Sequence, residues 1–390
     1  MTRETIFTSE SVTAGHPDKL CDQISDAAID AFLRQDPGAR AIVECAIATG
    51  VVFLAARFST GIAVDLPSLA RSVITDAGYV DTDFDARRCS ILTSFSEFTV
   101  ESSRSSSGHL DEAAFDDFVA HEQANAFGYA CHETADLMPL PISLAHDLAR
   151  ALDRARRADL SWLAPDAKTQ VAIVYADAKP VRLHSVSATA SVRAGVADAA
   201  EQLRHVISTT LAPAGSAIGS ATSININVDH HYESAGPARH AGLTGRKNGI
   251  DTYGEIARQS GAALSGKDPS RIDRIGAYAA RYAAKNVVAA GLADRCEVHI
   301  AYMIGQARPL SVAVNTFNTG RISDDDIAAR LNAILDLRPA AIQRRFALRT
   351  EPLRRDNRGF YRPLAVYGHF GRPDLDLPWE KTDLADALSG

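Results

Sequence analysis

The chain has 390 residues, of which 46% are hydrophobic and 23% are charged, so it is long enough to build two or three globular domains. Its formal net charge of -7 argues against a general nucleic-acid binder, because such proteins usually carry a basic surface. The N-terminal residues lack the apolar run of a signal peptide, and no stretch is long enough to cross a bilayer, so we expect a soluble, cytoplasmic protein that does not act at a membrane. Five scattered cysteines without metal-site spacing are expected to be reduced core residues and argue against a zinc site.

The first predicted element is a helix over residues 17–35, which includes most of the pentapeptide GHPDK at positions 15–19. Pro17 suits the first helical position, and apolar residues then recur at spacings of three and four. The free N–H groups and the dipole of a helix N-terminus suit a phosphate, while His16 can bond a developing oxyanion and Asp18 can hold a hard cation. The alternative is a capped surface helix that happens to carry charges.

The order helix, strand, turn, strand, helix occurs three times along the chain. The predicted units cover residues 17–35, 41–48, 51–58 and 66–77, then 142–157, 169–175, 181–192 and 197–211, and then 275–290, 297–303, 310–317 and a helix begun at Ser323. This repetition predicts an α+β fold of three pseudo-symmetric domains over residues 1–108, 109–232 and 233–390. Because two-stranded cores cannot bury both faces alone, we expect the sheets to pack together within the chain or across a dimer.

A parallel doubly wound nucleotide-binding sheet is disfavoured for this chain. Hairpins pair their strands antiparallel, and the sequence contains neither G-x-G-x-x-G nor G-x-x-x-x-G-K-[ST]. A serine-rich stretch at 102–108, within a loop over about 98–108, is expected to be a mobile lid or a connector.

Basic side chains occur in three turns marked by Gly or Asp, which predicts a polyphosphate cradle. They are Lys168 in PDAK, Arg246 and Lys247 in GLTGRK, and Lys267 in SGKDPS. Any one of them alone is more simply a solvated cation, but together with the helix end at His16 they favour an anion site. Asp273, at the start of a later helix, is either a second carboxylate for Mg²⁺ or a partner of the helix dipole.

Two further residues have alternative interpretations. Glu44 stands inside the apolar run AIVECAIA, where a lone charge is costly, so it is a cation ligand or a satisfied core carboxylate. Tyr232 can stack on a base or lie at a hairpin edge. The neighbouring His230 and His231 do not predict a metal site, because adjacent side chains of a strand point to opposite faces.

Taken together, the motifs resemble the S-adenosylmethionine synthetase (methionine adenosyltransferase) family over nearly the whole chain. The matching pieces include FTSESV at 7–12, GHPDK, LMPLPI at 137–142, PDAK, GLTGRK, DTYG at 251–254, SGKDPS, YGHFGR at 367–372 and PWEKTD at 378–383. The resemblance implies three pseudo-symmetric α+β domains and active sites between the subunits of a homodimer, or of a tetramer built from such dimers. It also implies attack of the methionine thioether on C5′ of ATP, with departure of tripolyphosphate, which is cleaved before release.

The resemblance implies roles for individual residues. His16 would assist departure of the triphosphate, which is neutralised by five cations: Lys168, Arg246, Lys247, Lys267 and Arg271, the last usually a lysine in the family. The ATP site would also include Asp166, Tyr232, His231, Ala263 and His240, with tyrosine where the family has phenylalanine and His231 where it has arginine. Asp18 and Asp273 would bind Mg²⁺, and Glu44 would bind K⁺.

Departures from the family pattern cluster at the methionine pocket. Arg57 replaces a glutamate, Phe98 a glutamine and His240 an aspartate, while GAGDQG reads VAHEQA with Glu122 at its acidic position. Because arginine repels the ammonium of methionine, these changes suggest a different nucleophile, such as another thioether or a small anion. Two alternatives stay open: an ordinary methionine adenosyltransferase in which Glu97 or Glu122 accepts the ammonium, and a non-catalytic nucleotide-binding homologue.

Overall fold

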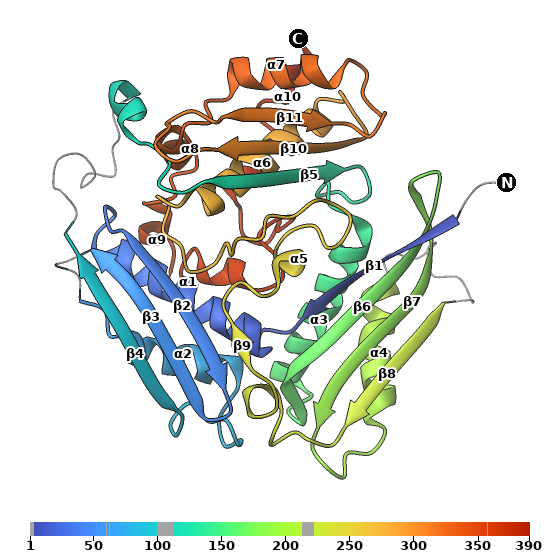
Figure 1. The fold of residues 1–390 in the computed structure, drawn as a ribbon. Coiled ribbons are helices and arrows are strands. Elements are labelled where there is room, and N and C mark those ends of the chain that lie inside the picture. Colours follow the sequence, from blue (N-terminus) through green and yellow to red (C-terminus); the bar gives the residue numbers. More distant parts are fainter. Residues whose placement is uncertain (1–3, 60, 62, 100–111, 213–221, 357) are drawn as a thin grey trace.

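The computed structural model describes residues 4–59, 61, 63–99, 112–212, 222–356 and 358–390. Three separate sheets surround a set of long helices, with the N-terminal sheet, the central sheet and the C-terminal sheet at the three corners of Figure 1. This is the three-domain α+β architecture predicted from the repeats. In the described part of the chain, no helix is both long and apolar enough to cross a membrane.

The N-terminal sheet has the order β4-β3-β2-β9, formed by Ser90–Phe98, Val51–Ser59, Ala41–Ala48 and Gly242–Leu243. Helix α1 (Pro17–Gln35) packs against β2 and β9, and α2 (Leu66–Ala77) packs against α1. Alternation in β2 directs Val43, Cys45 and Ile47 into the core. The intervening Glu44 lies on the opposite face and is exposed in the single chain, so of its two alternatives the core carboxylate is excluded and the cation ligand stays a prediction.

The central sheet has the order β1-β6-β7-β8, formed by Glu4–Val12, Leu163–Ala176, Lys179–Val192 and Ser223–Asp229. Helix α3 (Leu140–Ala158) packs on β6 and β1, and α4 (Ala199–Leu211) packs on α3 and β8. The C-terminal sheet has the order β11-β10-β5, formed by Ser311–Asn315, Arg295–Tyr302 and Ala124–Cys131. It is covered by α6 (Ile272–Ala289) and α7 (Asp324–Ile334).

Short elements complete the described fold. They are η1 (Glu112–Asp117), η3 (Gly236–Ala238), α5 (Asn248–Asp251), α8 (Pro339–Arg345), α9 (Glu351–Arg354), η4 (Arg362–Ala365), η5 (Pro378–Glu380) and α10 (Ala385–Ser389). All five cysteines are free and buried, as their scatter predicts. The predicted lid at 98–108 lies outside the described residues except at its start.

Each sheet receives a strand from a distant part of the sequence. Strand β1 pairs with β6 in the central sheet, β5 pairs with β10 in the C-terminal sheet, and β9 pairs with β2 in the N-terminal sheet. The three domain boundaries stay predictions, but these exchanges show that the sheets are not built from contiguous segments. One consequence matters for the site: β9 carries the GLTGRK loop to the start of α1.

The hairpins and main helices follow the predicted pattern, whereas several edge strands were not predicted. Strands β1, β4, β5, β8 and β9 were all missed. The predicted hairpins β2–β3 and β6–β7 are antiparallel, whereas the missed strands β4 and β8 pair parallel with β3 and β7. In β8 the alternation of Ile224, Ile226 and Val228 was an available signal.

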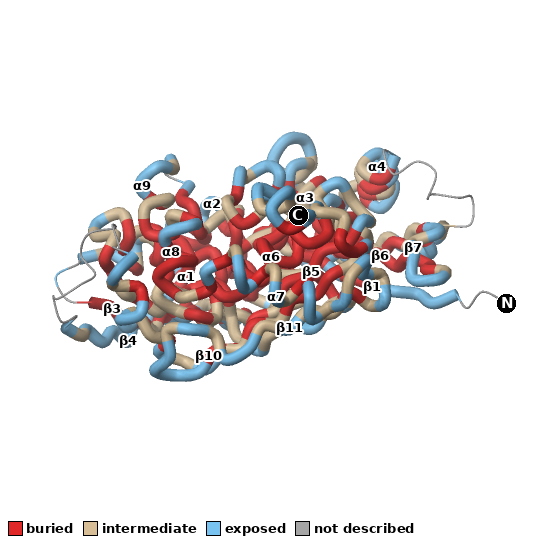
Figure 2. Tube along the Cα trace, turned by 90° about the horizontal axis from the view of Figure 1, so that it is seen from above, coloured by how far each residue is buried: buried red, intermediate tan, exposed pale blue. Residues whose placement is uncertain are grey.

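Buried residues run through the middle of the molecule, as Figure 2 shows, and include nearly the whole length of α1 and α6. Helix α1 is therefore buried on its polar side as well as its apolar side. Its buried charges, among them Lys19, Asp22, Asp26 and Asp30, need partners there, because an unpaired buried charge is costly. Those partners form the framework of the site.

Candidate active site

His16 caps the N-terminus of α1. Its backbone carbonyl accepts the first helical bond from Leu20 N (2.8 Å), and its ring Nδ1 accepts from Asp18 N (3.2 Å). Pro17 occupies the first helical turn, as predicted. A Cβ at Gly15 would lie 2.5 Å from the Pro165 carbonyl oxygen, so glycine is needed where this loop meets β6. The start of α1 is thus fixed against the central sheet.

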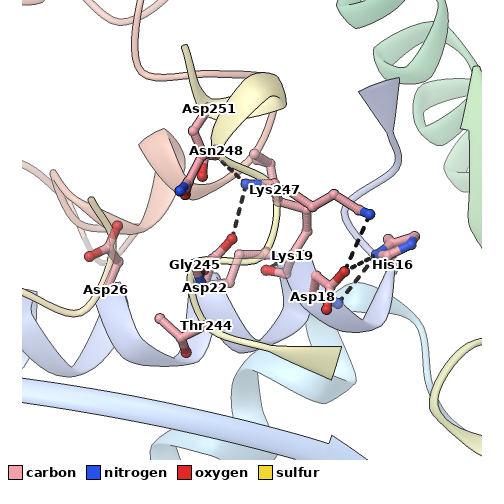
Figure 3. A network of polar contacts seen from close by, with 12 residues as sticks. His16, Asp18, Lys19, Asp22, Asp26, Thr244, Gly245, Lys247, Asn248 and Asp251 are labelled. Carbon is pink, nitrogen blue, oxygen red and sulfur yellow. Dashed lines mark hydrogen bonds and ion pairs between the residues drawn. The ribbon is translucent and has the colours of Figure 1, made fainter. Parts of the chain in front are cut away.

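The GLTGRK loop covers the first turn of α1. Asp18 Oδ1 accepts a hydrogen bond from Leu243 N (3.0 Å), while Arg246 Nη1 lies 3.7 Å from Oδ1 and Lys247 Nζ lies 3.6 Å from Oδ2. Figure 3 shows Asp18 between His16 and Lys247. A Cβ on Gly242 would lie 2.2 Å from the Pro17 backbone, so this close approach requires glycine. The structure therefore brings the predicted GHPDK and GLTGRK motifs together.

Four aspartates at intervals of four residues form one stripe along α1, which we call the aspartate stripe: Asp18, Asp22, Asp26 and Asp30. Each member accepts backbone N–H groups from the C-terminal half of the chain. The donors are Leu243 to Asp18, Gly245 to Asp22 (2.8 Å), Gly266 to Asp26 (2.8 Å), and Phe360, Tyr361 and Arg362 to Asp30 (2.9–3.0 Å). The sequence analysis missed the role of this stripe, although its four-residue spacing was an available signal.

Lys19 lies in a buried cluster beside the candidate site. Its ammonium binds Asp22 Oδ2 (3.0 Å) and Asp251 (Figure 3). All three side chains are almost completely buried. The two carboxylates raise the pKa of Lys19 against the opposing effect of burial, so it stays an ammonium. We infer that this cluster supports the loop that carries Arg246 and Lys247.

Asp166 and His240 form a second polar pair next to His16. Thr13 fixes the strand around Asp166, because its hydroxyl donates to Pro165 O (2.6 Å) and accepts from Ala167 N (2.8 Å). The register of β6 with β7 shifts between Leu163 and Ala167, in the segment that contains Asp166. His240 Nε2 lies 2.7 Å from Asp166 Oδ2, and the ring centroids of His16 and His240 are 5.1 Å apart.

The surroundings of His16 keep its imidazole neutral. Burial lowers its pKa to about 2, and the nearby His240, Lys247, Lys168 and Lys19 act in the same direction. Because Nδ1 accepts the Asp18 N–H, Nε2 carries the proton of the neutral ring. His16 is therefore a hydrogen-bond donor toward the site without carrying a charge.

We call this first group the helix-mouth cluster: His16, Asp18, Asp166, Lys168, His240, Arg246 and Lys247.

A second group, the Lys267 cluster, lies further along the molecule. Lys267 Nζ contacts Asp273 Oδ2 at 2.5 Å, and Arg271 pairs with Glu122. The backbone of Lys267 bridges to Ile42 of β2, and Arg274 binds both oxygens of Asp26 (2.6 and 2.7 Å).

The two clusters are separated within one chain. His16 begins α1, whereas the Lys267 cluster docks beside Asp26, ten residues later, which corresponds to about 15 Å along a helix. Every phosphate-binding cation predicted from sequence belongs to one of these two clusters, but one chain does not bring the two groups together.

The residues predicted to hold the nucleophile are likewise divided. The Arg57 guanidinium lies 5.2 Å from the centre of the Phe98 ring, so these two do meet. Arg57 pairs with Ile42 across the sheet, whereas Gly242, close to His240, pairs with Ile47. Five residues of strand separate the two positions by about 17 Å, so Arg57 and His240 do not share a pocket within one chain. Glu122 lies instead in the Lys267 cluster.

The remaining predicted ATP-site residues lie around these clusters. Tyr232 is half-buried, with the Arg193 guanidinium 4.4 Å from its ring centre, and His231 is exposed. Ala263 lies against Gly245, where an added Cβ would approach the Ala263 Cβ to 2.3 Å. Lys168 is exposed on β6, opposite Val12 of β1.

The fold and the helix-mouth cluster define a class of three-sheet α+β proteins with a cationic site at a helix N-terminus. Three family models match in sequence order: the N-terminal, central and C-terminal domains of S-adenosylmethionine synthetase, over residues 4–112, 117–232 and 234–381. The chain therefore belongs to the S-adenosylmethionine synthetase family, as its motifs predict.

Similar curated proteins extend over the full chain. An S-adenosylmethionine synthase of Synechococcus elongatus is 44% identical over 408 aligned residues, which cover 100% of this chain and 98% of the relative. A protein of the same name from Acaryochloris marina is 42% identical, covering 100% and 97%. The similar Thermosynechococcus vestitus protein is 43% identical, covering 97% and 95%.

These relatives correct the interpretation of the substituted methionine pocket. All of them are named S-adenosylmethionine synthase, which overturns the hypothesis of a nucleophile other than methionine. Within one chain, the register of the N-terminal sheet also separates Arg57 from His240, and the Arg57 guanidinium lies over the Phe98 ring, so the single chain does not form the pocket on which the hypothesis rested.

Proposed function

We propose that this enzyme is an ordinary methionine adenosyltransferase, which makes S-adenosylmethionine from ATP and methionine. In this reaction the methionine sulfur donates an electron pair to C5′ of ATP, the S–C5′ bond forms, and the C5′–O bond breaks. The triphosphate leaves with the electron pair of that bond and is then hydrolysed to diphosphate and phosphate. Such a displacement needs alignment and a stabilised leaving group more than a strong base.

The observation that carries this proposal is the helix-mouth cluster. The neutral His16 is placed to donate a hydrogen bond toward the leaving oxygen, and Arg246 and Lys247 sit beside the same helix end. Lys168 contributes to the positive potential at His16. A non-catalytic nucleotide-binding homologue would have no need of this whole set, so we favour the enzyme.

We further propose the cations and the ligands that hold them. The carboxylates of Asp18 and Asp273 offer the hard oxygen donors that suit Mg²⁺, which would share the charge of the triphosphate. Each of them faces a cation of this chain, Lys247 at 3.6 Å from Asp18 and Lys267 at 2.5 Å from Asp273, and these cations would reorganise around a bound phosphate chain. Glu44, exposed on β2, is the proposed K⁺ ligand.

A homodimer would reconcile the separated clusters. We propose that the helix-mouth cluster of one subunit faces the Lys267 cluster of its partner, so that each active site takes residues from both chains. The support is the division itself: the cations expected around one triphosphate fall into two groups about 15 Å apart within a chain.

Glu122 is our candidate for the acid that accepts the methionine ammonium. It lies in the Lys267 cluster beside Arg271, whereas Glu97 pairs with Phe58 and so points to the face of β4 opposite Phe98. We expect Glu122→Gln to raise the KM for methionine by about tenfold or more, as loss of a charged hydrogen bond predicts, with a smaller change in the KM for ATP. Equal changes in both constants would contradict this assignment.

The reaction is tested by incubating the purified protein with ATP, methionine, Mg²⁺ and K⁺ and detecting S-adenosylmethionine by mass spectrometry. Reactions without methionine are the matched control, and the Synechococcus elongatus relative is the positive control. We expect product and phosphate release that depend on methionine. Lack of product under conditions in which the relative makes it would contradict the proposal.

A further inference from the structure

Three side chains from distant segments meet within the helix-mouth cluster. His16 precedes α1, Asp166 lies in β6 and His240 follows η3. Each offers one ligand atom, and these three atoms lie within 4.8 Å of one another. Among the described residues, no other group of three or more His, Cys, Asp and Glu side chains has its ligand atoms this close together.

The carboxylate of Asp166 adds an independent indication of a ligand. Its side chain is only 10% exposed, and its Oδ2 contacts His240. Its second oxygen, Oδ1, is buried and has no hydrogen-bond partner in the described structure. A buried carboxylate oxygen without a partner is costly, so the site is incomplete as it stands.

We propose that His16, Asp166 and His240 bind one Zn²⁺ ion, or a similar transition-metal ion, in competition with ATP. Two imidazoles and one carboxylate, with a fourth position left open, are a common set of ligands for Zn²⁺. The imidazoles select against Mg²⁺, which prefers oxygen ligands. Arrangement in the sequence gives no hint of the site, because its members are separated by more than seventy residues at each step.

Around the two histidines, the hydrogen bonding favours metal binding, whereas the nearby lysines oppose it. Nδ1 of His16 accepts the Asp18 N–H, which leaves Nε2 as the metal-binding atom. When a metal binds Nε2, the ring proton moves to Nδ1, which gives up its hydrogen bond from Asp18 N and can donate instead toward Asp18 Oδ2, 3.9 Å away, as is usual for metal-bound histidine. Lys168 and Lys247 repel a cation, so binding depends on the strong metal–nitrogen bonds rather than on electrostatic attraction.

Binding is tested directly by isothermal titration calorimetry of the full-length, metal-free protein with ZnCl₂ in excess Mg²⁺. We expect one equivalent to bind the wild type, and at least tenfold weaker binding in both His240→Asn and Asp166→Asn. His205→Asn, which removes an exposed histidine of α4, is the matched control and should bind as the wild type does. With Co²⁺ in place of Zn²⁺, the wild type should show the visible absorption of a four-coordinate site, whereas His240→Asn and Asp166→Asn should not.

Equal Zn²⁺ affinity in the wild type and both ligand variants would overturn the proposal, as would the absence of a one-equivalent binding event in the wild type. Circular dichroism identifies a variant that has not folded, and the other variant then decides. The expected competition with ATP rests on the proposed function, whereas Zn²⁺ binding is measured without substrate. Failure of the metal site is therefore distinguishable from failure of the proposed reaction.

Discussion

The helix-mouth cluster and the Lys267 cluster use the same residue types in different states. At the helix mouth, Arg246 and Lys247 lie 3.6–3.7 Å from Asp18, and the Arg246 side chain is 54% exposed, so its charge is largely available to a ligand. In the Lys267 cluster, Lys267 and Arg271 each contact a carboxylate directly, and the Lys267 side chain is only 12% exposed. The difference suggests that the first cluster is open to an anion, while the second must exchange an internal partner for its ligand.

The largest expected effect comes from combining the two clusters in one dimer. Chains carrying His16→Asn and Lys267→Met, co-expressed with different tags, should each be inactive as homodimers. Purified mixed dimers should recover about half of the wild-type activity per dimer, because one of the two shared sites contains only wild-type residues.

Mixed dimers of His16→Asn with Lys168→Met are the matched control for this experiment. Both substitutions lie in the helix-mouth cluster, so neither site would be intact and no recovery is expected. Inactive dimers of His16→Asn with Lys267→Met, once shown to form, would mean that the two clusters do not share a site across the interface.

The next largest effect should be on stability, at the buried ammonium behind the helix mouth. Lys19→Met leaves the carboxylates of Asp22 and Asp251 buried without their cation, which costs about 3–5 kcal/mol of unfolding free energy. The thermal unfolding midpoint should fall clearly, whereas Lys179→Met in the exposed β6–β7 hairpin should leave it nearly unchanged. If Lys19→Met is as stable as the wild type, the inference that this buried cluster supports the fold of the site is wrong.

A smaller loss is expected when a cation that faces the ligand is removed. Lys168→Met should lower kcat by about 10²- to 10³-fold, the usual effect of losing one group that stabilises a developing negative charge. Because Lys168 is exposed, the unfolding midpoint should change little. Steady-state kinetics on this variant and on Lys179→Met compare the two lysines, and similar rates in both would exclude Lys168 from the reaction.

The smallest effect concerns the pH dependence of stability at His16. Burial, with His240 and Lys247, lowers its pKa in the folded protein to about 2 from about 6.5 when unfolded. Below pH 6.5 the unfolded chain therefore binds one more proton, and stability falls as the pH falls. Between pH 7 and pH 5 this single group should cost about 2 kcal/mol.

Urea unfolding of the wild type and of His16→Asn at pH 7 and pH 5, both in EDTA, measures this contribution. Between pH 7 and pH 5, the free energy of unfolding should fall by about 2 kcal/mol less in His16→Asn than in the wild type. Equal losses in the two proteins would show that His16 titrates normally and is not held neutral.

Local patterns in the sequence were sufficient for the main elements of the fold. Helix α1 runs from Pro17 to Gln35 and α2 from Leu66 to Ala77, as predicted, because helix period, proline position and capping are all properties of neighbouring residues. The edge strands could not be placed in the same way. A strand such as β9, with only two residues, exists because β2 presents an unpaired edge to it.

The candidate site shows the same division. The motifs GHPDK, PDAK, GLTGRK and SGKDPS predicted the residue types and the turns of the anion site. They did not predict how these residues group in space, since that depends on which segments the sheets bring together. The exposure of Glu44 excludes one of its two alternatives, a core carboxylate, and the sheet register places Arg57 away from His240 within one chain, although both were expected in one pocket.

The motifs in the sequence were enough to predict the family, and periodicity and capping, which are set within a few residues, were enough to predict the three α+β units and the start of α1. What the aspartate stripe binds and what meets His16 depend on contacts between distant segments, so these came from the tertiary structure. Strands β1 and β9 pair with β6 and β2, which lie more than 150 residues away in the sequence, and the register of these long-range pairs fixes their contacts. That register divides the predicted cations into two clusters and brings His16, Asp166 and His240 together.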